Sequence, residues 1–216
     1  KDAAWREAFA TGLEADGAAY GLALLGGDTV STPGPVAVSA TLFGWVPAGK
    51  AVLRAGARAG DQLLVAGCIG DGLLGLKAAR GDVADPAGRL AAHYRLPEPR
   101  LDLRDALRAR AHACADVSDG LLADALHIAE ASGLGVHIAL ERLPLSAEAG
   151  AWLAGEADPC AARLALATGG DDYALVIAAS GPIAGAVAVG GFSAEQGVRV
   201  TFNGAPVELA ALGFRH

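Results

Sequence analysis

The stretch Asp116–Gly120, with the sequence Asp-Val-Ser-Asp-Gly, separates a run of small and apolar residues from a helical pattern. Apolar residues between Leu121 and Ala129 recur at helical spacing, so Ser118 or Asp119 is predicted to cap a helix. A helix start also presents backbone N–H groups and the positive end of the helix dipole, which favour phosphate. Two carboxylates repel a bare phosphate, so a phosphate joined through Mg²⁺ is the alternative to simple capping. Both interpretations stay open at this point.

The combination of glycine and acid recurs at three other places. Gly26–Thr29, Gly67–Gly72 and Gly169–Tyr173 each combine glycines with an aspartate. Each adjoins a short apolar run that is predicted to be a strand, and in α/β sheets ligands collect at strand ends. These segments are therefore candidate binding turns, and for Gly26–Thr29 a tight turn with a polar tip explains the pattern equally well.

Helical stripes alternate with short apolar strands along the chain, which predicts α/β or α+β layering rather than a repeat array. The expected helices include residues 3–20, 73–80, 101–110, a helix that ends near 132, and 144–166 with a break at 158–159. The expected strands are 22–25, 35–46, 63–66, 112–115, 135–140, 174–178 and 198–202, with a hairpin turn at 203–204. We place a domain boundary near residue 50.

The composition excludes several classes of protein. The 216 residues are 53% hydrophobic and carry a net charge of −7, so the basic surface needed by a nucleic-acid binder is missing. The three cysteines, Cys68, Cys114 and Cys160, have no framework spacing, which favours reduced thiols and a cytoplasmic protein. The uncharged stretches 29–49 and 173–194 contain prolines and glycines, so each is predicted to be buried strands joined by turns rather than a membrane span.

Six motifs, taken in order, resemble the thiamine-monophosphate kinase family, which belongs to the aminoimidazole ribonucleotide synthetase-like superfamily. The motifs are Gly26–Thr29, Arg54–Asp61, Gly70-Asp71, Arg95–Arg100, Asp116–Gly120 and Gly169–Tyr173. The resemblance implies a fold of two α/β domains with ATP bound between them. Residues 1–50 would be a remnant of the N-terminal ATP- and Mg²⁺-binding domain, and residues 51–216 would be the C-terminal α/β domain.

The resemblance also implies an activity and a set of site residues. The implied reaction is direct in-line transfer of the ATP γ-phosphoryl group to thiamine monophosphate, which gives thiamine diphosphate. By motif, the implied metal ligands are Asp28, Asp116 and Asp119; the implied ATP contacts are Gly27, Asp28, Arg54 and Ser118; and the implied substrate contacts are Asp171 and Phe214. Several carboxylates with Mg²⁺ and one arginine suit phosphoryl transfer, which needs positioning and charge neutralisation.

The chain also departs from the family pattern. Family members carry an N-terminal segment of about a hundred residues that holds most of the other Mg²⁺ ligands and much of the homodimer contact. A nucleotide-contacting tyrosine is replaced by Ala10, and a turn glutamate by Ala174. We therefore keep two alternatives: another ATP-using enzyme of the superfamily, such as an amidine-forming synthetase or a hydrogenase-maturation factor, and a non-catalytic fragment that binds nucleotide or thiamine phosphate. The ending Phe-Arg-His, without a cysteine, counts against the maturation factor.

Overall fold

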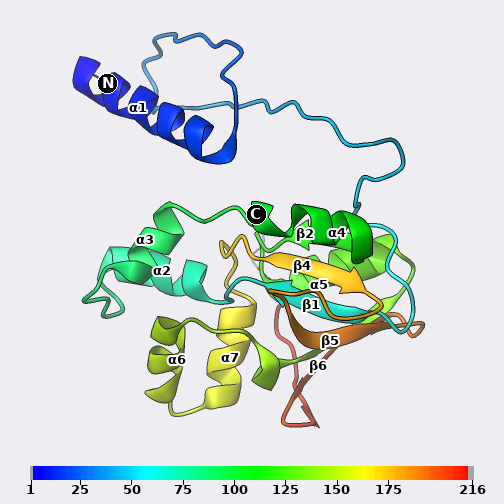
Figure 1. Cartoon of the computed structure of the whole chain (residues 1–216). Coiled ribbons are helices and arrows are strands. Elements are labelled where there is room, and N and C mark those ends of the chain that lie inside the picture. The colour runs from blue at the N-terminus through cyan, green and yellow to red at the C-terminus, as the bar shows by residue number, and fades with distance from the viewer. Residues whose placement is uncertain (1, 214–216) are drawn as a thin grey trace. The chain divides into compact units, whose positions relative to one another are not determined.

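The computed structural model describes residues 2–213, and the chain divides into two compact units between Trp45 and Val46 (Figure 1). The first unit contains helix α1, Ala3–Tyr20. Asp2 caps this helix by accepting the N–H of Trp5 at 2.9 Å, and Gly21 ends it in the left-handed conformation with a φ of 66°. The predicted helix over residues 3–20 is therefore confirmed.

The expected strands at residues 22–25 and 35–46 are wrong, because residues 21–50 contain no strand. Their apolar side chains lie in solvent, and Leu24 and Trp45 are 82% and 92% exposed. A strand is stable only when a neighbouring strand satisfies its backbone groups. Within the described part of the first unit, the regular structure is helix α1, which offers no such edge.

The second unit is built on a seven-stranded mixed sheet. Its strands are β1 (Gln62–Ala66), β2 (Ala111–Asp116), β3 (Gly135–Ala139), β4 (Leu175–Ala179), β5 (Val187–Ser193), β6 (Gly197–Phe202) and β7 (Ala205–Pro206). The spatial order is β2-β4-β1-β5-β3-β6-β7, and β3 pairs with β6 in parallel while the other neighbours are antiparallel. The uncharged stretch 173–194 forms β4 and β5, as predicted, and Asn203-Gly204 joins β6 to β7.

Helices cover the sheet and extend from it. They are α2 (Asp71–Arg80), α3 (Arg89–Arg95), α4 (Arg104–Arg110), α5 (Leu121–Ala131), α6 (Ala147–Ala154) and α7 (Pro159–Ala167), with 3₁₀ turns η1 (Leu101–Leu103) and η2 (Leu140–Arg142). The α/β layering expected from the sequence is confirmed. Among residues 2–213, no helix is both long and apolar enough to cross a membrane.

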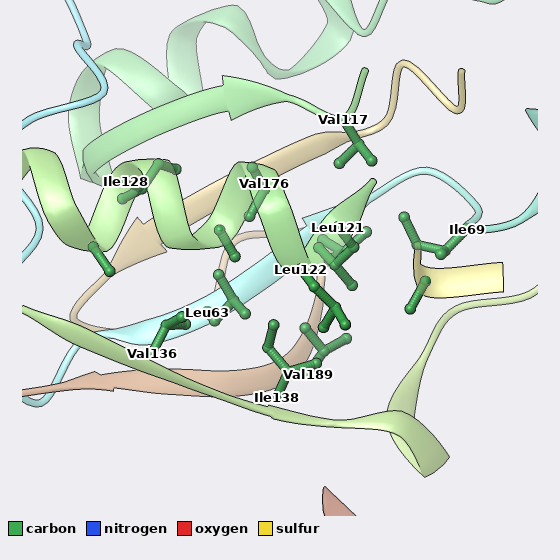
Figure 2. Packing of buried hydrophobic residues seen from close by; sticks show 14 of the residues in the cluster. Leu63, Ile69, Val117, Leu121, Leu122, Ile128, Val136, Ile138, Val176 and Val189 are labelled. Atoms are coloured by element: carbon green, nitrogen blue, oxygen red, sulfur yellow. The ribbon is translucent and has the colours of Figure 1, made fainter. Parts of the chain in front are cut away.

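The core lies on both faces of the sheet, because successive side chains of a strand point to opposite faces. On one face, Leu63 packs with Leu121, Leu122 and Ile128 of α5 (Figure 2). On the other face, Leu64 packs with Leu103 of η1 and with neighbouring strand residues. A third cluster joins α2, α3, α6 and α7 through Leu74, Leu90, Ala149 and Leu166.

Candidate functional site

Three of the four candidate turns meet at one end of the sheet. Strands β1 and β2 both pair antiparallel with β4, and Ala66 of β1 and Asp116 of β2 both lie opposite Leu175, the first residue of β4. Strands β1 and β2 therefore finish at the same end of the sheet at which β4 begins. The turns 67–72, 117–120 and 169–174 are close together for this reason, and Ile69 and Val117 lie toward the same end of the core in Figure 2.

Backbone hydrogen bonds join two of these turns directly. The N–H of Asp171 donates to the carbonyl of Ser118 at 2.9 Å, and the N–H of Tyr173 donates to the carbonyl of Val117 at 2.8 Å. In the reverse direction, the N–H of Val117 donates to the carbonyl of Ala174 at 2.8 Å. The predicted metal turn and the predicted substrate turn are thus joined by three backbone hydrogen bonds.

Asp171 and Tyr173 adopt an unusual backbone conformation within this pair of turns. Their φ angles are 58° and 50°, in the left-handed region that side chains with a Cβ rarely occupy. Such residues persist where the surrounding structure holds them, and they concentrate at functional sites. Burial, together with the nearby carboxylates of Asp171 and Asp116, raises the pKa of the Tyr173 phenol.

Asp172, which lies between Asp171 and Tyr173, points inward and is 2% exposed. Its carboxylate accepts the N–H of Gly70 at 2.9 Å and the N–H of Gly72 at 2.9 Å, at the start of α2. Burial raises the pKa of Asp172 to about 7, although the two amide hydrogen bonds act in the opposite direction. His93 Nε2 lies 3.3 Å from the Asp172 carbonyl oxygen.

The Asp116–Gly120 turn is not capped as the sequence predicts. Gly120 occupies the cap position of α5 with a φ of 127° and makes no side-chain cap bond. Asp124, one turn into the helix and 2% exposed, instead accepts the N–H groups of Ser118, Asp119 and Gly120 at 3.0, 3.1 and 3.3 Å. The prediction that Ser118 or Asp119 caps the helix is therefore wrong, because Gly120 occupies the cap position and the turn before it is held by Asp124 from within the helix.

A cavity of about 490 Å³ opens beside this pair of turns. It is lined by Pro97–Leu101, Arg104, Leu107, Asp116, Tyr173 and Leu175. The volume lies in the range of small-ligand sites, roughly 300–1,000 Å³. Its wall combines apolar side chains with cationic and anionic groups, which suits a ligand that has both an apolar ring and a charged part.

Arg54 lies beside the edge strand that leads into the site. The carbonyl of the preceding residue, Leu53, accepts the N–H of Cys114 in β2 at 3.0 Å. The Ser132 hydroxyl accepts the N–H groups of Gly56 and Ala57, both at 3.1 Å, so the segment is held between β2 and the end of α5. The Arg54 side chain is exposed, which leaves its guanidinium accessible to a phosphate.

Gly27 and Asp28 belong to the first unit, where the Asp28 carboxylate accepts the N–H of Thr29 at 2.7 Å. Phe214 lies outside the described residues.

The donor set at the paired turns is compatible with Mg²⁺. No group of three His, Cys, Asp or Glu side chains placed to hold a metal occurs within residues 2–213. Mg²⁺ is commonly bound by one or two carboxylates with waters and substrate phosphates, so a site at Asp116 and Asp119 would not require a third protein carboxylate.

Sequence reasoning missed the supporting roles of Asp124 and Asp172. Asp124 carries a charge on the apolar side of α5, next to Ala125 and one turn before Ile128, and this was the signal that it is buried and bonded. For Asp172 the sequence shows two adjacent acids, but not which of them points inward.

The chain matches a known class of proteins over most of its second unit. Residues 58–200 match the family described as AIR synthase related protein, C-terminal domain, so this part of the chain is that of an AIR synthase-related protein. Thiamine-monophosphate kinase of Caulobacter vibrioides is 50% identical over 100% of this chain and 64% of that protein. The Salmonella typhimurium enzyme is 34% identical over 100% of this chain and 70% of that protein.

Within this class the chain belongs to the thiamine-monophosphate kinase family. A solved structure described as AaThiL complexed with AMPPCP and TMP is 30% identical, with a TM-score of 0.63. The alignment covers 75% of this chain and 53% of that one. By length, the chain spans 64% of its Caulobacter vibrioides relative.

Proposed function

We propose that the protein to which this chain contributes transfers the γ-phosphoryl group of ATP to thiamine monophosphate and forms thiamine diphosphate. The observation that carries the proposal is the direct backbone pairing of Asp116–Gly120 with Gly169–Tyr173 beside a ligand-sized cavity. It is supported by family membership and by the relative solved with AMPPCP and TMP.

In this proposal Asp116 and Asp119 hold Mg²⁺, and Ser118 contacts ATP. Arg54 binds the ATP phosphates, because its planar, permanently charged fork matches phosphate oxygens. When bound, Mg²⁺ neutralises charge on the phosphoryl oxygens. The residues of this chain then bind and align the two substrates for in-line transfer, with no covalent enzyme intermediate.

Asp171 contacts thiamine monophosphate in this proposal, and Phe214 packs against its rings. Gly27 and Asp28 contribute to the ATP and metal sites from residues 1–50, which we assign to the N-terminal domain of the family fold. We further propose a homodimer in the cytoplasm, with no nucleic-acid or membrane partner.

Replacing Asp116 by Asn tests the metal assignment. We expect thiamine diphosphate formation and Mg²⁺-dependent nucleotide affinity to fall by about 10–100-fold, because one hard anionic ligand is lost. The exposed position of Asp116 at the end of β2 predicts an unchanged melting temperature. Isothermal titration with a non-hydrolysable ATP analogue, with and without Mg²⁺, measures the effect.

Glu195→Gln is the matched control, because Glu195 is an exposed carboxylate paired with Arg199 on the distant strand β6. This variant should bind and react as the unchanged protein does. Normal Mg²⁺-nucleotide affinity in Asp116→Asn would remove Asp116 from the metal site.

A further inference from the structure

Two buried carboxylates adjoin the proposed site without any assigned contact to a ligand. Asp124 and Asp172 are each 2% exposed, and buried acids of this kind are rare unless they are bonded. Both are bonded mainly to backbone N–H groups, and in each case those bonds involve a turn of the site.

One carboxylate oxygen of Asp124 accepts hydrogen bonds from three backbone amides. The N–H groups of Ser118, Asp119 and Gly120 all donate to Oδ2, while Oδ1 lies 3.7 Å from Nδ1 of His127. Three consecutive amides directed at one atom define the curvature of the turn. That curvature sets the positions of the carboxylates on either side of Ser118, which are the proposed Mg²⁺ ligands.

Asp172 acts on the other turn through helix α2. Its carboxylate is held by the amides of Gly70 and Gly72, and its own backbone lies between Asp171 and Tyr173, which have positive φ. Drawing the Asp172 side chain inward leaves the two flanking residues on the outer side of the turn. The contact with α2 therefore opposes the strain of the left-handed conformation at both positions.

We infer that Asp124 and Asp172 are positioning residues with separate tasks: Asp124 orders the turn for Mg²⁺ and nucleotide, and Asp172 orders the turn for the phosphate of the acceptor substrate. The inference rests on the proposed function for the identity of these ligands. The backbone bonds between the turns involve neither carboxylate, so the loss of one carboxylate loosens chiefly its own turn.

Steady-state kinetics of the full-length protein separate the two tasks. In Asp124→Ala the KM for Mg²⁺-ATP should rise by about tenfold or more, with the KM for thiamine monophosphate changed by less than about threefold. Asp172→Ala should show the reverse pattern, because a small misplacement of a binding group is costly. Asp124→Asn keeps an oxygen for the three amides, so it should restore most of the nucleotide KM.

Hydrogen exchange provides a readout that does not depend on activity. The amides of Asp171 and Tyr173 bond to Ser118 and Val117 rather than to Asp172. Faster exchange of these two amides in Asp172→Ala, by about tenfold or more with the β1 amides unchanged, supports positioning even in a protein that does not turn over thiamine monophosphate. Unchanged exchange at both amides overturns it. Absence of turnover in the unsubstituted protein counts against the proposed function alone.

Asp158→Ala is the matched control for the loss of carboxylate-to-amide bonds. Asp158 accepts the N–H groups of Cys160 and Ala161 at the exposed start of α7, so its loss should lower the melting temperature and leave both KM values unchanged. Equal increases of both KM values in the Asp124 and Asp172 variants would show a merely structural role and overturn the inference. If the alanine variants fail to fold, Asp124→Ser and Asp172→Ser, which remove the carboxylate but keep a short polar side chain, decide it by the same comparison.

Discussion

At the scale of single residues, the burial of a carboxylate and its hydrogen bonds oppose one another. Asp172 has two backbone donors, yet its pKa rises to about 7, because the loss of hydration outweighs the bonds. Asp71 is similar: burial raises its pKa even though the Ser146 hydroxyl donates to it at 2.6 Å. Burying Asp172 and Asp71 as carboxylates therefore has a net electrostatic cost in the folded state, and this is a disadvantage near neutral pH.

This disadvantage predicts a pH dependence of stability. The unfolded chain releases the Asp172 proton near its ordinary pKa of 3.8, whereas the folded chain keeps it until about pH 7. The folded state thus binds more protons between these values, and the free energy of unfolding falls as the pH rises through this window. The groups that face Asp172 include Asp71 of α2, Asp171 and His93 of α3.

Urea unfolding of the unchanged chain and of Asp172→Asn at pH 5 and pH 8 measures this effect. The variant lacks the titration, so its stability relative to the unchanged chain should improve from pH 5 to pH 8. Asp124, which is not among the groups that act on Asp172, contributes equally in both proteins and cancels in the comparison. The same stability difference at both pH values would show that Asp172 does not change its protonation state between pH 5 and pH 8, which would contradict this prediction.

At the scale of elements, the close approach of α2 to the substrate turn explains a glycine. A Cβ at Gly72 would lie 2.4 Å from the carbonyl carbon and oxygen of Asp171, and 2.5 Å from the carbonyl oxygen of Gly170. These are backbone atoms, so the helix or the turn would have to move. The amide of Gly72 can reach the Asp172 carboxylate because no side chain intervenes.

Gly72→Ala should therefore lower the free energy of unfolding by about 1–3 kcal/mol, despite the higher helix propensity of alanine. Gly150→Ala is the matched control, since Gly150 also lies within a helix and a Cβ there would meet nothing within 4 Å. That variant should gain about 0.4–1 kcal/mol. Chemical denaturation measures both, and a stabilised Gly72→Ala would contradict the packing argument.

At the scale of the whole molecule, the sequence predicts the second unit well and the first poorly. Most strands of the sheet follow from apolar runs, because each run has neighbouring strands on which to pack. The run at 35–46 has the same composition but no partner strand among the described residues, so composition alone misleads there. The pairing of the two turns at 117–120 and 169–174 depends on strand order, which a single sequence does not reveal.

Limited proteolysis of this chain checks the division into units. Cleavage should begin between residues 21 and 50, which contain no helix or strand and are exposed, and leave a resistant fragment that contains the sheet. Mass spectrometry of the fragments identifies the sites. First cleavage between β1 and β4 would show that the second unit is less compact than its core indicates.

The backbone bonds between Val117–Ser118 and Asp171–Ala174 also restrict how this chain can evolve. Inserting or deleting one residue in either turn shifts its amides and carbonyls out of register with those of the other. Tolerated changes of length should therefore fall in exposed connections such as residues 81–88 and 155–158, and a change in one paired turn should be inherited with a compensating change in the other.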